Sequence, residues 1–192
     1  MKKIIVVLLF TIISASAVMA QSRVAFKWHG FYSVLDYSHG FNVNRSVDTI
    51  TANMLSFVAG YQFRKEAGVG VGVTYFADTK DGFTQMPFFI ELRSHYLNSR
   101  ITPYSAFQLG YCIPMGTERS EPPVTKIESG GVYFGAELGA RFAIERSFAI
   151  GIHVGFKALQ STEIVRRDAQ NVDAVKEVAQ LNVLDFGISL HF

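Results

Sequence analysis

The last residues of the chain alternate strictly between apolar and polar side chains. The apolar positions are Leu184, Phe186, Ile188, Leu190 and Phe192. The residues between them are Asp185, Gly187, Ser189 and His191. Because successive side chains of a β-strand point to opposite faces, this pattern predicts a strand with one apolar face and one polar face.

The same alternation recurs along the chain and predicts eight strands. They span about residues 23–34, 55–63, 68–75, 88–96, 106–113, 132–142, 148–157 and 184–192. The first is the weakest, because its alternation blurs near Gly30 and Phe31, where a β-bulge would account for the change of phase. No stretch after residue 20 has the 18 uninterrupted apolar residues of a membrane-spanning helix.

The connections between these strands alternate between short and long. Short polar turns are predicted at residues 64–66, 98–99 and 144–146, and longer loops at 36–48, 78–85, 115–129 and 159–179. Within the last loop, residues 173–180 could form a short amphipathic helix. Bacterial outer-membrane barrels combine short periplasmic turns with longer external loops in this way.

The bulk of the apolar face decides how the strands are oriented. Its Phe, Leu, Ile and Val side chains would overfill the interior of an eight-stranded barrel, whereas glycines with scattered charges suit a narrow polar lumen. We therefore expect an all-β, eight-stranded antiparallel up-and-down transmembrane β-barrel rather than a soluble ligand-binding barrel. Aromatic residues cluster near both ends of the predicted strands, as the interfacial girdles of such barrels do.

The first 20 residues have the features of a secretory signal peptide. Lys2 and Lys3 precede an apolar run from Ile4 to Ile13, and small residues lead to Ala20. We expect cleavage before Gln21, which leaves residues 21–192 as one exported barrel domain in the outer membrane.

Composition excludes several other classes of protein. The formal net charge of +2 is carried by the leader, since 18 basic and 16 acidic residues become balanced once Lys2 and Lys3 are removed. A nucleic-acid partner is therefore not expected. The single cysteine, Cys112, excludes an internal disulfide framework and a cysteine-based zinc site.

Three segments resemble the small porin-like outer-membrane β-barrel family of Gram-negative bacteria, whose barrels are of the OmpA-like type. They are residues 100–104 (RITPY) continuing into 108–111 (QLGY), residues 135–142 (GAELGARF), and the alternating strand that ends in Phe192. The resemblance implies a barrel fold and an outer-membrane location. It also implies that the apolar positions of the last strand form a C-terminal signal for the barrel assembly machinery.

The polar faces predict an ion-pair network inside the barrel. Its expected members are Lys27, Glu91, Arg93, Glu137, Arg141, His153, Lys157 and Asp185. A tight turn centred on Glu145 would place Glu137 opposite His153 and Tyr133 opposite Lys157, and a turn at Asn98–Ser99 would place Arg93 beside Tyr104. We expect these pairs to fill the lumen around Glu137; an alternative is a gate that opens when a pair exchanges partners.

No catalytic, metal or cofactor site is expected. His95, His153 and His191 fall on three different strands at unequal heights, and Asp185, Ser189 and His191 run along one strand, where they cannot form a catalytic triad. We expect a monomer in contact with outer-membrane lipid, with a structural role or with binding of an unidentified extracellular ligand by the long loops. Passage of small solutes or ions is the alternative, and lipid modification is a third.

Overall fold

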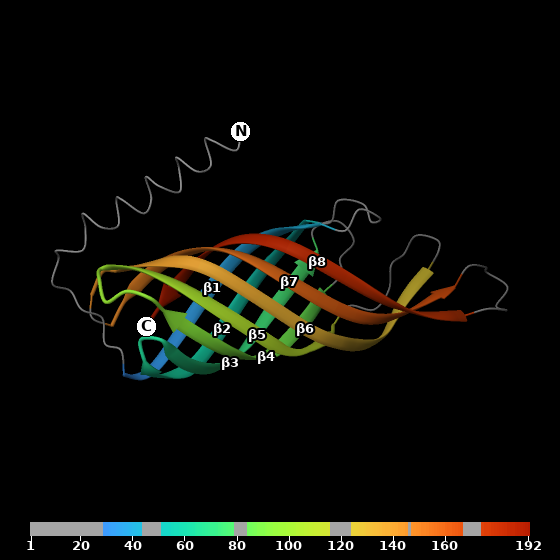
Figure 1. Ribbon diagram of the computed structural model, residues 1–192. Coiled ribbons are helices and arrows are strands. Elements are labelled where there is room, and N and C mark those ends of the chain that lie inside the picture. Colours follow the sequence, from blue (N-terminus) through green and yellow to red (C-terminus); the bar gives the residue numbers. More distant parts are fainter. Residues whose placement is uncertain (1–28, 44–50, 79–83, 116–123, 146, 167–173) are drawn as a thin grey trace.

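The computed structural model describes residues 29–43, 51–78, 84–115, 124–145, 147–166 and 174–192, which form one closed antiparallel barrel (Figure 1). The strands are β1 Gly30–Asn42, β2 Thr51–Arg64, β3 Ala67–Asp78, β4 Thr84–His95, β5 Ile101–Pro114, β6 Val124–Ala143, β7 Ala149–Arg166 and β8 Ala174–His191. The expected signal peptide and Lys27 lie outside the described residues. Within those residues, no helix is long and apolar enough to cross a membrane.

Each strand pairs with the next along the chain, and β1 pairs with β8 to close the barrel. In this closing pair Tyr37 lies opposite Ile188. The end of the chain is tied to β1 by two backbone hydrogen bonds, from Ser33 N to Phe192 O (3.1 Å) and from Phe192 N to Ser33 O (2.9 Å). Closure satisfies the backbone polar groups that an open sheet edge would expose, which is a requirement inside a lipid bilayer.

The apolar face of the barrel points outward. Leu109 is 63% exposed and Ile188 59% exposed, whereas Glu91 and Asp185 are completely buried inside. This arrangement is the reverse of that in a soluble protein and is characteristic of a transmembrane barrel. The predicted fold class and the predicted orientation of the faces are both confirmed.

Exposed aromatic side chains are found near both ends of the strands, as the sequence predicts. Toward the short turns they are Tyr61, Phe63, Tyr96, Phe142 and Phe192, and toward the long loops they are Tyr75 and Tyr111. Phe156, expected near a long loop, lies in the middle of the longer β7. The rings of Phe148 and Phe192 pack with centroids 5.4 Å apart. Such rings suit the two interfaces of a bilayer, where an apolar body meets water.

The first strand is displaced from its predicted position. It runs over Gly30–Asn42 rather than 23–34, so Asp36 and Ser38 face the lumen instead of starting a loop. The polar character of residues 36–48 favoured a loop. However, Leu35, Tyr37 and Phe41 keep the alternation going on the outer face, and this weak signal was the correct one.

The last three strands are longer than predicted. β7 and β8 take up most of the expected loop 159–179, and β6 takes up the end of the expected loop 115–129. β6 has 20 residues and β7 and β8 have 18 each, compared with 12 to 14 in the others. The helix expected over residues 173–180 is wrong, because Ala174–Gln180 belongs to β8. Nor do short and long connections alternate strictly, since 79–83 is no longer than 96–100.

Two predicted pairings are wrong by two residues. Glu137 lies opposite Gly155 rather than His153, and Tyr133 lies opposite Leu159 rather than Lys157. The cause is the position of the turn. The last pair before it is Ala143 with Ala149, so the turn is centred one residue later than Glu145. Each residue of β6 therefore pairs two residues further along β7 than predicted.

The same displacement occurs at the β4–β5 turn. Arg93 lies opposite Ala106 rather than Tyr104. Its guanidinium nevertheless sits over the Tyr104 ring, 4.9 Å from the centroid, because diagonal neighbours on a sheet are within reach of long side chains.

Candidate functional site

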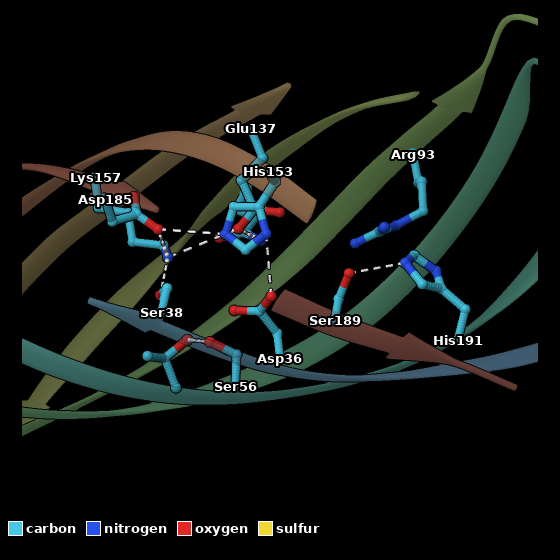
Figure 2. Close-up of polar contacts among 12 residues, drawn as sticks. Asp36, Ser38, Ser56, Arg93, Glu137, His153, Lys157, Asp185, Ser189 and His191 are labelled. Carbon is cyan, nitrogen blue, oxygen red and sulfur yellow. Dashed lines mark hydrogen bonds and ion pairs between the residues drawn. The ribbon is translucent and has the colours of Figure 1, made fainter. Parts of the chain in front are cut away.

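The lumen contains a layer of buried charged residues, which we call the ionic layer (Figure 2). Its members are Asp36, Glu91, Arg93, Glu137, Arg141, His153, Lys157 and Asp185. Apart from Lys27, which lies outside the described residues, the structure places every residue of the predicted network here. Asp36 is the member that the sequence prediction missed.

On β4, Arg93 and Glu91 form a two-point ion pair. Arg93 donates from Nε to Glu91 Oε1 (2.7 Å) and from Nη2 to Glu91 Oε2 (3.1 Å). Gln108 on β5 then joins two carboxylates, because its Nε2 donates to Glu91 Oε2 and to Glu137 Oε1, both at 3.1 Å. Charged groups out of water are stable when they are paired and hydrogen-bonded in this manner.

Lys157 on β7 holds the second group of carboxylates. Its Nζ lies 2.9 Å from Asp185 Oδ2 and 3.8 Å from Glu137 Oε1, and it donates to Ser38 Oγ at 3.4 Å. Lys157 lies opposite Gly135, so Glu137 is its diagonal neighbour. Glu137 therefore connects the two groups of charges near the middle of the network.

His153 lies between two aspartates. Its Nδ1 is 3.2 Å from Asp36 Oδ2, and its Nε2 is 3.4 Å from Asp185 Oδ2 (Figure 2). The sequence prediction paired it with Glu137. That assignment is wrong, because the register of β6 and β7 is displaced.

Near the short-turn end, Ser189 and His191 form a buried hydrogen bond of 2.9 Å between Oγ and Nε2 (Figure 2). His191 also packs edge-on against Tyr104, with centroids 5.6 Å apart. Asp185 is occupied by Lys157 and His153 further up the lumen. Arg141 is buried in the same lumen, at 3% exposure.

A cluster of buried apolar side chains, which we call the apolar layer, also fills the lumen. Its members are Val34, Ala52, Met54, Val58, Phe76, Phe89, Cys112, Tyr133, Leu159 and Val183, and they come from all eight strands. On β7 and β8 it continues the lumen toward the long loops, since Leu159 and Val183 follow Lys157 and Asp185 in that direction. Tyr133 joins the two layers by donating to Gln108 Oε1 at 2.7 Å.

The inward face is predicted from the sequence to be polar, so this apolar layer is an unexpected feature of the lumen. The signal was present, because Met54, Phe76 and Leu159 continue the inward phase of their strands beyond the predicted ends. A glycine on the neighbouring strand leaves room for one of these side chains: a Cβ on Gly72 of β3 would meet the ring of Phe89, its partner on β4, at 2.5 Å. Among the described residues, no group of three or more His, Cys, Asp or Glu is placed to hold a metal ion.

The chain matches no protein-family model and no curated protein sequence. Solved structures with this fold do match. Neisserial surface protein A is 16% identical with a TM-score of 0.58, over 84% of this chain and 97% of that one. Outer membrane protein OprG from Pseudomonas aeruginosa is 14% identical with a TM-score of 0.60, over 88% and 99% of the two chains.

Outer membrane protein AlkL, solved in DMPC bilayers, is 14% identical with a TM-score of 0.52, over 90% of this chain and 93% of that one. At these identities the likeness concerns the fold. The protein is a small eight-stranded barrel of the outer-membrane type, as the resemblance found in its sequence implied, and it contains buried ion pairs.

Proposed function

We propose that the protein is an integral outer-membrane protein with a closed lumen, which acts as a structural element and as a scaffold for external binding loops rather than as a pore or an enzyme. This proposal rests on the observation that two sets of side chains, one charged and one apolar, fill the lumen. An eight-stranded barrel is just wide enough for its own side chains to fill it. Here the ionic layer and the apolar layer together fill the lumen. On β4, β7 and β8 the apolar members lie nearer the long loops than the charged ones, whereas Val34 on β1 lies nearer the short turns than Asp36.

The apolar layer supports a closed lumen independently of the ion pairs. Phe76 and Tyr133 are completely buried, and Leu159 is 1% exposed. Apolar constrictions of this kind oppose passage of ions by excluding water. An exchange of partners within the ionic layer alone would therefore leave the lumen closed.

The projecting strands support a role in binding. β6, β7 and β8 extend past the ends of the other strands, at the end of the barrel opposite the C-terminus (Figure 1). Pairing of β7 with β8 continues out to Arg166 and Ala174. A sheet that carries a loop away from the bilayer presents it to soluble or surface-bound partners, and loops on rigid scaffolds commonly provide binding specificity.

The outward apolar band supports an outer-membrane location, with the cleaved leader and the barrel assembly machinery as the route of export. The test is fractionation of cells that express the full chain, followed by gel electrophoresis with and without boiling. We expect the protein in the outer-membrane fraction and a change of mobility on boiling. Recovery in a soluble fraction would contradict this location.

The closed lumen is tested by conductance in planar bilayers. Wild-type protein and Glu137→Ala are expected to give no stable channel, since the apolar layer is intact in both. Phe76→Ala combined with Glu137→Ala weakens both layers and is the positive control. Steady conductance of the wild type would instead favour passage of small ions, and altered lipids in a deletion strain, detected by mass spectrometry, would favour an enzyme.

A further inference from the structure

The environment of His153 has a chemical consequence that goes beyond a closed lumen. Both of its ring nitrogens lie within 3.4 Å of a carboxylate oxygen, from Asp36 on β1 and Asp185 on β8. A neutral imidazole has one donor nitrogen and one acceptor nitrogen, and an ionised carboxylate is an acceptor only. Neither nitrogen meets hydrogen-bond geometry here, so both contacts are ion-pair contacts. A neutral ring would hold its lone pair near one carboxylate, whereas an imidazolium places positive charge beside both.

The charge balance of the ionic layer leads to the same conclusion. The buried residues that the structure describes include four carboxylates (Asp36, Glu91, Glu137, Asp185) and three fixed cations (Arg93, Arg141, Lys157). Arg93 is committed to Glu91. Lys157 faces both Asp185 and Glu137, which leaves Asp36 without a lysine or arginine among the ion pairs described. One additional positive charge makes the layer neutral, and uncompensated buried charge is costly.

His153 is the best-placed histidine to carry that charge. The other two buried imidazoles, His95 and His191, lie within electrostatic reach of the guanidinium groups of Arg93 and Arg141. His153 instead faces Asp36, Asp185 and, at longer range, Glu137, with the ammonium of Lys157 as the opposing charge. The attraction of three carboxylates for a positive charge on the His153 ring exceeds the repulsion by one ammonium group.

The backbone next to His153 is shaped to let the ring span a strand. Gly187 on β8 lies between His153 on β7 and Ser38 on β1 in the same row of the sheet. A Cβ on Gly187 would overlap the His153 ring. The absence of a side chain there lets the imidazole cross β8 and reach Asp36.

We propose that Asp36, His153 and Asp185 form a proton-binding site, with the proton held by the imidazole, which ties β7 to β1 across β8 where the barrel closes. The bound proton turns three mutually repelling carboxylates into a stabilised cluster. Loss of the proton at high pH leaves the ionic layer with one uncompensated negative charge beside the closing strands. The site is thus also a pH-sensitive element of barrel closure.

The direct test is ¹⁵N NMR of histidine-labelled full-length protein in detergent micelles from pH 6 to pH 9. The His153 signals are identified by their loss in His153→Gln, and the exposed ring of His39 serves as the reference. We expect both His153 nitrogens to show the protonated pattern at pH 8, above the ordinary imidazole pKa of about 6.5. A neutral-ring pattern at pH 7 would overturn the proposal.

Asp36→Asn provides a second test that keeps the ring and changes little in shape. Removal of one carboxylate should lower the pH at which His153 loses its proton by at least one unit, and an unchanged midpoint contradicts the assignment. At pH 8, adding Asp36→Asn to His153→Gln should restore stability against urea, because it removes the negative charge that the imidazolium no longer balances. Absence of rescue would indicate that His153 acts by packing. None of these results depends on whether the lumen conducts.

Discussion

Arg93 donates hydrogen bonds to both carboxylate oxygens of Glu91, which lies two residues away on the same strand. Side chains two apart on a strand share a face, so β4 supplies a complete ion pair to the lumen by itself. Both residues are buried, Glu91 completely and Arg93 to 4% exposure. The pair therefore needs no particular register to form, unlike the contacts that join different strands.

This pair gives the first prediction. Arg93→Met should lower the free energy of unfolding by about 3–5 kcal/mol, since it leaves Glu91 charged and buried without its partner. Urea unfolding in lipid vesicles, followed by far-UV circular dichroism, measures the loss. Glu91→Gln introduced with Arg93→Met removes the stranded charge and keeps an acceptor for Gln108, so the double variant should recover most of the stability. An equally unstable double variant would mean that Arg93 acts through its contact with Tyr104.

The second prediction concerns the outward face. Leu138 is 62% exposed on β6, directly after the lumen residue Glu137. If residue 138 faces the bilayer midplane, Leu138→Arg should lower the free energy of unfolding by about 2–4 kcal/mol. The same change near an interface should lower it by about 0–1 kcal/mol. The matched control is Leu97→Arg in the connection between β4 and β5. Similar unfolding free energies for the two variants would contradict the placement of Leu138 in lipid.

A third prediction uses the single cysteine. Cys112 is completely buried in the apolar layer. A membrane-impermeant maleimide should therefore leave it unmodified in the folded barrel and label it fully in urea, as measured by mass spectrometry. Ser147→Cys places a thiol in an exposed turn and controls for reagent activity. Rapid labelling of Cys112 in the folded protein would reveal water in the lumen.

The architecture could be predicted from sequence because it depends on one strong regularity. A strand that separates lipid from a narrow lumen must alternate, so seven of the strands could be located by their outward residues. The first was misplaced because Asp36 and Ser38 inside, and His39 outside, make both faces of β1 polar near its end. The alternation then no longer separated strand from loop.

The partners of the lumen residues could be predicted less well, because they depend on turn geometry. A change of one residue in the centre of a turn moves every pairing by two, which preserves the face of each residue and changes its neighbours. Glu137 and His153 thus both face the lumen, as predicted, but His153 contacts Asp36 and Asp185. The inward phase of a strand shows which apolar residues enter the lumen, but it does not show which of them meet there across several strands.

The last prediction separates assembly from stability at the C-terminus. The predicted assembly signal consists of Leu184, Phe186, Ile188, Leu190 and Phe192, and the side chain of Phe192 is 51% exposed. Its backbone is held by Ser33 whatever its side chain, and the ring adds a contact with Phe148 worth about 0.5–1.5 kcal/mol beyond its burial. Phe192→Ala should therefore refold in vesicles with a modest loss of stability, yet accumulate much less than wild type in the outer membrane of cells. Phe107→Ala on β5, a 54% exposed ring outside the predicted signal, is the control for loss of an outward ring. Equal accumulation of both variants in cells, measured as heat-modifiable protein in the outer-membrane fraction, would show that the terminal ring has no special part in assembly.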